Sequence, residues 1–335
     1  MKRCKRFLII LAGVAAVGIA ASAQRGTGSD RFDALDAYSR EHRGEALLIV
    51  KGEKTIYESY VIGRGGSFPW FLASGTKSFS GAMCAAAIED GLISGFDEKV
   101  SDTITEWKGD PRRSKITIRQ LLSLTSGISS GQIGSVPSYA DAVRSPSIAE
   151  PGERFAYGPV PFQIFGELMK RKLKDRNETV YAYLKRRILD PIGLKPFGWR
   201  GSDADPLLPQ GASMTAGEWA KFGILLKNGG NWNGKQIIAK RYLDELVKGT
   251  NANPGYGITF WLNAEGKDPA GRPRGLMVGS RDDKRQVRGG DVYMAAGAGD
   301  QRLYVIPSLD VVVVRFGFFG GFDDREFLDL LIKAL

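Results

Sequence analysis

The sequence is poor in the two residue types that most often build metal sites and assist serine nucleophiles. It has one histidine, His42, within the charged run Arg40–Arg43, and two cysteines, Cys4 and Cys84. Zinc sites are built mainly from histidine and cysteine, so a zinc site of the usual kind is excluded. A serine–histidine–aspartate centre would lack a usable histidine base. Any serine chemistry in this chain must therefore pass its proton to another residue type.

The first 23 residues have the pattern of an export signal. An uncharged apolar stretch, Phe7–Ala20, follows four basic residues, and Ala21–Ala23 fits a small-x-small cleavage site before Gln24. This apolar stretch is shorter than the run of about 20 residues that spans a bilayer, so an uncleaved anchor is the less favoured alternative. We therefore expect a periplasmic or secreted protein that begins at Gln24 and has no stable membrane anchor.

Cleavage would leave Cys84 as the only cysteine, so no internal disulfide could form. Cys84 lies in the apolar run Ala82–Ala87 and is expected to be a small core residue. The formal charge of +10 would fall to about +6, without a stripe of lysine and arginine interleaved with aromatic residues. We expect no nucleic-acid partner.

Strand and helix patterns are distributed unevenly along the chain. Runs that predict strands lie near both ends, helical spacing dominates the middle, and no strong strand signal occurs between residues 95 and 230. We therefore predict one α+β domain over residues 24–335. Its mainly antiparallel sheet would draw on residues 30–75 and 230–335, flanked by helices, with an all-helical insertion at 76–229. Expected strands are 46–50, 55–62, 256–261, 302–306 and 311–316, and expected helices are 30–42, 74–90, 118–124, 161–172, 179–189, 215–228 and 324–335.

Ser74 stands three residues before Lys77 at the predicted start of a helix. This spacing places both side chains on one helical face, so the lysine amine can lie close to the serine hydroxyl. Backbone N–H groups at a helix start can also stabilise a developing oxyanion. The alternative is that Ser74 caps the helix and Lys77 is a surface residue. The four-residue pattern alone does not decide between the two.

Four further segments accompany Ser74–Lys77 along the chain: Leu121–Ile128, Phe155–Pro159, Thr215–Asn233 and Gly297–Gln301. In this order, the five segments resemble landmarks of the serine β-lactamase and penicillin-recognising enzyme family, in particular its class C β-lactamase-like and esterase branch. The resemblance runs from about residue 30 to the C-terminus and implies the β-lactamase/transpeptidase-like fold. It implies no cofactor and no metal.

The resemblance also implies roles for individual residues. The serine would attack a carbonyl carbon and become acylated, the lysine would take or relay its proton, and the tyrosine would be the partner base and later the acid for the leaving group. Backbone amides would form the oxyanion hole. The implied site residues are Ser74, Lys77 and Tyr157 for catalysis, and Ser74, Gly297, Ala298 and Gln301 for the oxyanion and substrate.

Two positions depart from the family pattern. Pro159 replaces an asparagine that usually contacts the lysine and the substrate amide, and Ala295 stands where the third motif usually has a basic residue. The second change argues against efficient use of carboxylate-bearing β-lactams and favours neutral esters or simple amides. A group of basic residues just upstream is expected to form a solvated loop: Arg281, Lys284, Arg285 and Arg288.

The sequence thus predicts an exported serine acyl hydrolase that forms a covalent acyl-enzyme with a small-molecule ester, amide, lactam or peptide substrate. Two alternatives stay open. The departures at Pro159 and Ala295 are compatible with a catalytically inactive, penicillin-binding-like binding protein. A D-Ala-D-Ala peptidase would differ from the hydrolase only in its substrate.

Overall fold

The computed structural model describes residues 24–25, 30–275, 277–278 and 288–335. The predicted signal peptide, residues 1–23, lies outside the described residues, as do Arg281, Lys284 and Arg285 of the expected basic loop. Among the described helices, none combines the length and apolar character needed to cross a membrane.

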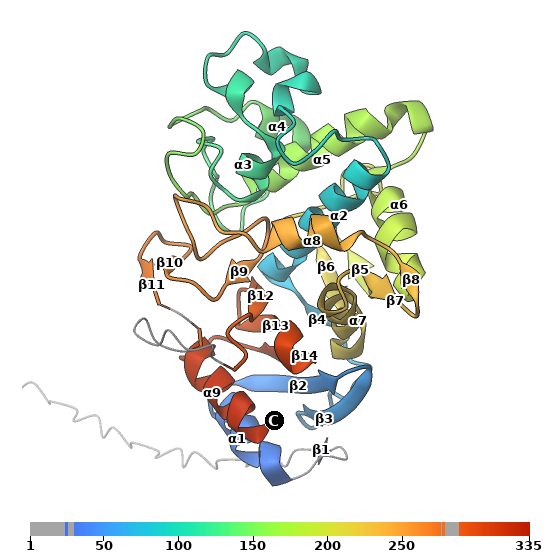
Figure 1. The fold of residues 1–335 in the computed structure, drawn as a ribbon, viewed down its shortest axis with the longest axis vertical. Coiled ribbons are helices and arrows are strands. Elements are labelled where there is room, and N and C mark those ends of the chain that lie inside the picture. Colours follow the sequence, from blue (N-terminus) through green and yellow to red (C-terminus); the bar gives the residue numbers. More distant parts are fainter. Residues whose placement is uncertain (1–23, 26–29, 276, 279–287) are drawn as a thin grey trace, which may run out of the picture.

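The predicted sheet exists and joins the two ends of the chain. Every neighbouring pair of its strands is antiparallel, in the order β1-β3-β2-β14-β13-β12-β9. The blue N-terminal and red C-terminal strands lie side by side in Figure 1. The strands are β1 (Gln24–Arg25), β2 (Gly44–Lys51), β3 (Lys54–Tyr60), β9 (Trp261–Leu262), β12 (Tyr293–Gly297), β13 (Gln301–Ile306) and β14 (Val311–Gly317).

The central strand β14 is buried along its whole length. Its run of four valines, Val311–Val314, suits a strand covered on both faces, because β-branched side chains pack well on a pleated surface. Helix α1 (Asp33–Glu41) packs on β2 and on α9 (Asp324–Ala334), while α7 (Ala216–Lys227) covers the sheet with contacts to β2, β13 and β14. The buried strands at the centre of the sheet are therefore enclosed by helices.

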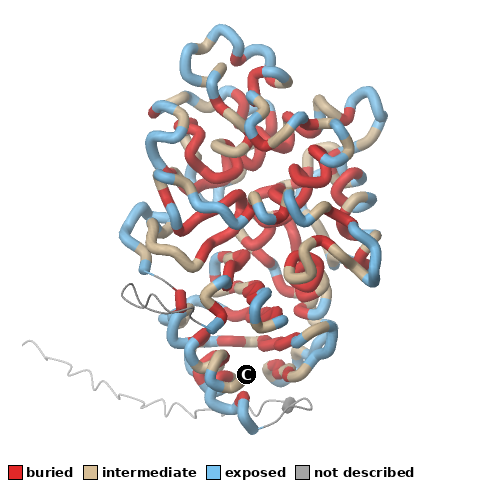
Figure 2. The backbone as a smooth tube through the Cα atoms, viewed as in Figure 1, coloured by how far each residue is buried: buried red, intermediate tan, exposed pale blue. Residues whose placement is uncertain are grey.

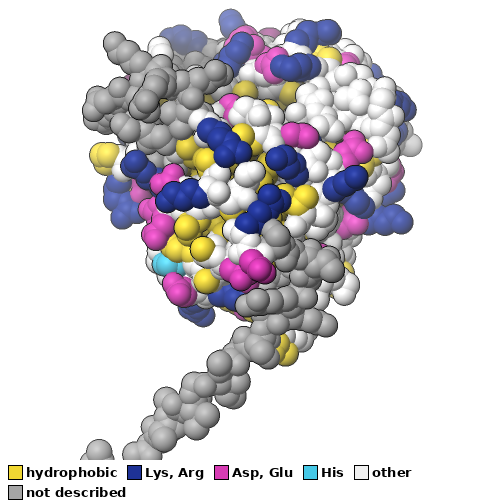
Figure 3. Space-filling view, turned by 60° about the horizontal axis from the view of Figure 1, so that its bottom comes forward, with side chains coloured by type: hydrophobic (Ala, Val, Ile, Leu, Met, Phe, Trp, Pro, Cys, Tyr) yellow, Lys and Arg dark blue, Asp and Glu magenta, His cyan; other side chains and the backbone are white. Residues whose placement is uncertain are grey.

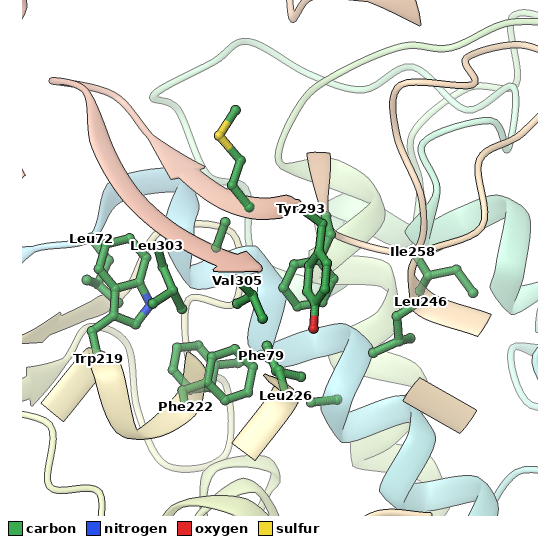
Figure 4. Packing of buried hydrophobic residues seen from close by; sticks show 14 of the residues in the cluster. Leu72, Phe79, Trp219, Phe222, Leu226, Leu246, Ile258, Tyr293, Leu303 and Val305 are labelled. Carbon is green, nitrogen blue, oxygen red and sulfur yellow. The ribbon is translucent and has the colours of Figure 1, made fainter. Parts of the chain in front are cut away.

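Helix α7 joins the sheet to the helical part of the molecule. Its Trp219 stacks on Phe316 of β14 at 5.3 Å between ring centroids, and its Phe222 stacks on Phe79 of α2 (Ser78–Glu89) at 4.2 Å. Figure 4 shows these α7 side chains directed toward Leu303 of β13. Figure 2 shows buried segments running through the interior of both the sheet and the helical part, with exposed segments along the outside.

The middle of the chain is mainly helical, as predicted. Helix α2 is buried on every side from Ser78 to Ile88, which is expected of an apolar, alanine-rich helix at the centre of a domain. Helices α3, α4 and α5 lie at the end of the molecule far from β2 (Figure 1). The helices of the middle and the next segment are α2 (Ser78–Glu89), α3 (Ile118–Leu122), α4 (Tyr139–Val143), α5 (Val160–Leu173), α6 (Val180–Leu184) with a π-helical continuation (Lys185–Leu189), and α8 (Lys240–Leu246).

Two strand predictions are wrong. Residues 256–261 do not form a strand, because Thr259 adopts a left-handed backbone with φ of 72° and only an isolated bridge joins Tyr256 to Trp261. The expected absence of strands between residues 95 and 230 also fails, at β5 (Gly198–Trp199) and β6 (Ala212–Met214). Strands of two or three residues carry no readable periodicity, and here they form a small sheet of β4 (Trp70–Phe71), β6 and β5.

Two short hairpins complete the described strands: β7 (Asn231–Trp232) with β8 (Lys235–Gln236), and β10 (Gly266–Lys267) with β11 (Pro273–Arg274).

On the face shown in Figure 3, basic side chains are interspersed with acidic and apolar ones.

Candidate active site

Ser74 and Lys77 meet as their spacing predicts. A 3-10 turn, Ala73–Lys77, runs directly into α2, and Lys77 Nζ lies 2.9 Å from Ser74 Oγ. The same Nζ donates a hydrogen bond to the carbonyl oxygen of Pro209 at 2.9 Å. The lysine is only 4% exposed, so the alternative of a surface lysine is wrong. The amine is instead held inside the protein, against the serine hydroxyl.

The turn that carries Ser74 is anchored on both sides. Ala73, just before the serine, has a left-handed backbone with φ of 48°, which is uncommon for a residue other than glycine. Strand β6 holds the turn, because Leu72 N donates to Ala212 O and Ala212 N donates to Thr76 Oγ1. These bonds hold the backbone on either side of Ser74 against β6.

Burial sets the protonation of Lys77. The side chain is enclosed by protein, with the rings of Tyr157 and Phe162 at 5.0 and 5.4 Å from Nζ. Because desolvation disfavours the ammonium, the pKa of Lys77 falls from 10.5 to about 7. A substantial share of this lysine is therefore a neutral amine at neutral pH, with a lone pair able to accept a proton.

Tyr157 faces the same cleft as Ser74. Its ring stacks on Trp261 at 5.7 Å between centroids. Burial raises the pKa of Tyr157 to about 12, although a hydrogen bond with Ser74 and the charge of Arg302 act in the opposite direction. Tyr157 is thus a protonated phenol at neutral pH, which can donate a proton.

Strand β12 brings a backbone loop against the serine turn. Gly297 ends this strand, and a Cβ atom at this position would collide with the carbonyl oxygen of Leu72 and lie 3.2 Å from the backbone nitrogen of Gly75. Only glycine permits this approach. Gly297 and Ala298 line the cleft together with Ser74, as the predicted oxyanion loop requires.

Gln301 does not line the cleft in front of Ser74. The structure places it outside the cleft lining, with its amide bonded to backbone: Nε2 donates to Gly299 O and Gly317 O, and Oε1 accepts from Gly317 N. The side chain joins the turn between β12 and β13 to the end of β14. These bonds hold the loop that contains Gly297.

The space in front of Ser74 is a cleft of about 640 Å³. This volume is in the range of small-molecule sites. Besides the residues above, its lining includes Ile133, Trp261 and Phe319. Among the residues that the structure describes, no group of three histidine, cysteine or acidic side chains could hold a metal ion.

Comparison with known proteins identifies the family. Residues 29–317 match the model of the family described as Beta-lactamase. The chain belongs to the β-lactamase family. No curated protein matches the sequence significantly.

Several solved structures share the fold of this β-lactamase-family chain. A Bacteroides dorei protein assigned as a β-lactamase aligns with a TM-score of 0.71 and 17% identity over 92% of this chain and 99% of its own. A Bacillus anthracis protein assigned as a 6-aminohexanoate-dimer hydrolase aligns with a TM-score of 0.68 and 19% identity, covering 90% and 80%. A family VIII carboxylesterase aligns with a TM-score of 0.66 and 16% identity, covering 94% and 100%.

The two departures from the family pattern are both placed outside the cleft lining. Pro159 directly precedes α5, and its carbonyl oxygen accepts from Phe162 N. Ala295 is only 2% exposed, whereas its neighbour Ala296 lines the cleft.

Sequence reasoning missed Arg302, which lines the cleft of this β-lactamase-family protein. Its Nε donates to Asp324 at 2.7 Å, and its Nη1 donates to the carbonyl oxygen of Gly297 at 3.3 Å. The arginine therefore supports the loop beside Ser74 and brings a positive charge toward Tyr157. Its position directly after the Gly297–Gln301 segment was the available signal.

Proposed function

We propose that this protein is an exported serine acyl hydrolase that cleaves an ester or amide through a covalent acyl-enzyme on Ser74. The observation that carries the proposal is the contact between Oγ of the half-buried Ser74 and Nζ of the buried Lys77, 2.9 Å apart, at the edge of a cleft. A nucleophilic serine without a histidine needs such a neighbouring base. Membership of a family of serine hydrolases supports the same reaction class.

In the proposed acylation step, the neutral amine of Lys77 takes the proton of Ser74 as Oγ attacks the carbonyl carbon. The pKa of about 7 makes this amine a better base at neutral pH than Tyr157, whose pKa is about 12. The negative charge that forms on the carbonyl oxygen would be held by the amides of Ser74 and the Gly297–Ala298 loop.

The leaving group then departs with a proton. Tyr157, still a phenol, would donate its proton to the leaving oxygen or nitrogen and recover one from the Lys77 ammonium. This leaves an ester of Ser74, a free alcohol or amine, and a neutral lysine. A water molecule attacks the ester in the second half-reaction with the same groups, and the serine recovers its proton as the carboxylic acid leaves.

The comparisons support ester and amide substrates as the first to test. One similar structure carries the name of a carboxylesterase and another that of an amide-oligomer hydrolase. The absence of a basic residue at Ala295 is the reason to place β-lactams after these two classes.

The proposal is tested by locating the acylated residue. The protein lacking residues 1–23 is incubated with a fluorophosphonate, and the adduct is located by mass spectrometry. We expect one adduct on Ser74 and none in Ser74→Ala, with parallel loss of p-nitrophenyl butyrate turnover. Labelling that persists in Ser74→Ala would refute the assignment.

The alternative, a catalytically inactive binding protein, predicts the opposite result for turnover. A catalytically inactive relative would give no Ser74-dependent release of p-nitrophenol. A D-Ala-D-Ala peptidase would form the adduct but prefer D-Ala-D-Ala peptides over esters and linear amides in the same assay.

Export is tested separately. The full-length chain is produced in a bacterial host, the periplasmic fraction is collected, and the N-terminus is sequenced. We expect a protein that begins at Gln24. A full-length chain in the cytoplasm would reject this part of the proposal.

A further inference from the structure

The cleft in front of Ser74 is lined by several charged side chains whose partners can be traced one by one. Each of the four acidic side chains in its lining already has a partner. Asp268 accepts from Arg272, Asp300 and Asp324 accept from Arg302, and Asp323 accepts from two backbone amides at the start of α9. Two of the three arginines in the lining, Arg272 and Arg302, are thereby paired.

Arg274 is the third arginine in the lining, and it differs from the other two in its ion pairs and hydrogen bonds. It forms no ion pair with any carboxylate that the structure describes. Its one hydrogen bond to a described residue runs from Nη1 to the carbonyl oxygen of Leu262, at 3.2 Å. A guanidinium carries five N–H donors, so most of this donor capacity has no partner among the described residues.

Neighbouring groups hold the Arg274 guanidinium in place. It lies 5.4 Å from the centre of the Trp261 ring, and that ring stacks on Tyr157. Leu262 and Trp261 belong to β9, which pairs with β12 beside the oxyanion loop. The arginine is therefore oriented by a strand of the main sheet, within the cleft that contains the nucleophile.

Burial disfavours the charge of Arg274, and the nearby carboxylates of Asp324 and Asp268 offset this only in part. The side chain is partly enclosed by protein, and burial lowers the pKa of Arg274. A guanidinium that has lost water on one side and retains free donors gains most from a planar oxyanion, which it can bind through two parallel hydrogen bonds.

We infer that Arg274 binds a carboxylate on the substrate. The inference rests on the proposed acyl hydrolase function and narrows its substrate class to esters or amides that carry a carboxylate away from the scissile bond. It departs from the expectation of neutral substrates drawn from Ala295, because a cation on β11 faces the cleft in place of one on β12.

Two pairs of synthetic esters test the inference and show which part of the substrate carries the charge. For the acyl side, p-nitrophenyl hydrogen glutarate is compared with its neutral amide analogue, p-nitrophenyl glutaramate. For the leaving-group side, 4-carboxyphenyl butyrate is compared with 4-carbamoylphenyl butyrate. We expect kcat/KM to favour the carboxylate in one pair by about tenfold or more, after subtraction of hydrolysis without enzyme.

Three variants decide whether Arg274 is responsible. Arg274→Gln should abolish the preference, and Arg274→Lys should keep part of it, because the charge stays but the two-point geometry is lost. Arg272→Gln is the matched control: this neighbouring arginine is exposed and already paired with Asp268, so its loss should leave the preference in place. An unchanged preference in Arg274→Gln, or an equal loss in Arg272→Gln, overturns the inference.

Binding to Ser74→Ala separates this inference from the proposed function and from folding defects. Calorimetry measures the Kd of each ester for the Ser74→Ala protein and for the same protein with Arg274→Gln. Tighter binding of a carboxylate ester that depends on Arg274 supports the inference even if the wild type hydrolyses nothing. Equal Kd values for charged and neutral esters overturn it even if the wild type hydrolyses both.

Discussion

Arg302 on β13 lies directly opposite Ala296 on β12, and both residues line the cleft beside Ser74. The family pattern would place its basic residue at Ala295, the neighbour of Ala296. The sheet of this protein therefore brings a positive charge to the site from the adjacent strand.

Replacing Arg302 with methionine should lower ester turnover by about tenfold or more, because Gly297 loses a hydrogen bond to its carbonyl and Tyr157 loses a nearby positive charge. The substitution also removes the charged partner of Asp324, which keeps only the Tyr304 hydroxyl as a side-chain donor among the described residues, and this should destabilise the fold by about 3–5 kcal/mol. Turnover and urea denaturation measure the two effects. Adding Asp324→Asn should restore much of the stability but not the rate, and a double variant with wild-type turnover would contradict the role.

Acylation should depend on pH through Lys77. Below its pKa of about 7 the lysine is protonated and cannot accept the serine proton, so the rate should rise with pH up to about 7 and then level. Tyr157, with a pKa of about 12, stays protonated over this range. Pre-steady-state release of p-nitrophenol measures the rate. Lys77→Ala should lose the inflection and several powers of ten in rate; a wild-type inflection retained in this variant would assign it to another group.

Lys77 should also make stability depend on pH. Its folded pKa of about 7 lies below its ordinary value of 10.5, so between these values the unfolded chain binds more protons. The free energy of unfolding should therefore rise with pH in this window, by at most about 1.4 kcal/mol per pH unit from this group. Urea denaturation of the wild type and Lys77→Met isolates the contribution. The stability difference should be largest below pH 7 and shrink toward 10.5; a constant difference would contradict the lowered pKa.

Tyr157→Phe should affect poor leaving groups most. The phenol is proposed to protonate the departing atom, and p-nitrophenolate leaves without that help. Turnover of alkyl esters and amides should therefore fall by about 10²-fold or more, and that of p-nitrophenyl esters by much less. Tyr256→Phe is the control, since Tyr256 is buried against Tyr157 but lies outside the cleft lining. Equal losses for both kinds of ester in Tyr157→Phe would remove the tyrosine from the proton path.

Gly297→Ala should separate β12 from the serine turn. The added methyl group would collide with the carbonyl oxygen of Leu72, so the oxyanion loop must shift. We expect kcat to fall by about 10²-fold and stability by about 1–3 kcal/mol. Gly217→Ala, on the exposed side of α7 where a methyl group meets no close neighbour, should change neither. A Gly297→Ala enzyme with wild-type kcat would contradict the oxyanion role.

The fold could be predicted where the sequence carries a strong local pattern. The valine run of β14 and the helical spacing of α9 are readable without neighbours. Strands β5 and β6 could not be predicted, because β6 is defined by its pairing with the distant β4, and β5 only by its pairing with β6.

At the candidate site, too, local contacts could be predicted and long-range contacts could not. The contact between Ser74 and Lys77 follows from their spacing along one helical turn, and Gly297 came from the family resemblance. The second partner of Lys77, the carbonyl oxygen of Pro209, is 132 residues away and carries no side-chain signature. The same is true of the role of Gln301, which depends on backbone atoms of β14 that its own segment does not reveal.

The pairing of β2 with β14 has a consequence for how the active protein arises. The central sheet cannot close until the last strand has been synthesised, and the loop beside Ser74 is built on the strands that close it. Contacts between such distant segments slow folding, since a long loop must be ordered before they form. Recovery of acyl transfer during refolding should therefore be a late event, and a chain truncated before β14 should have none. Under the proposed export, a chain that closes so late would stay unfolded during transfer across the membrane and assemble its proposed nucleophile on the far side.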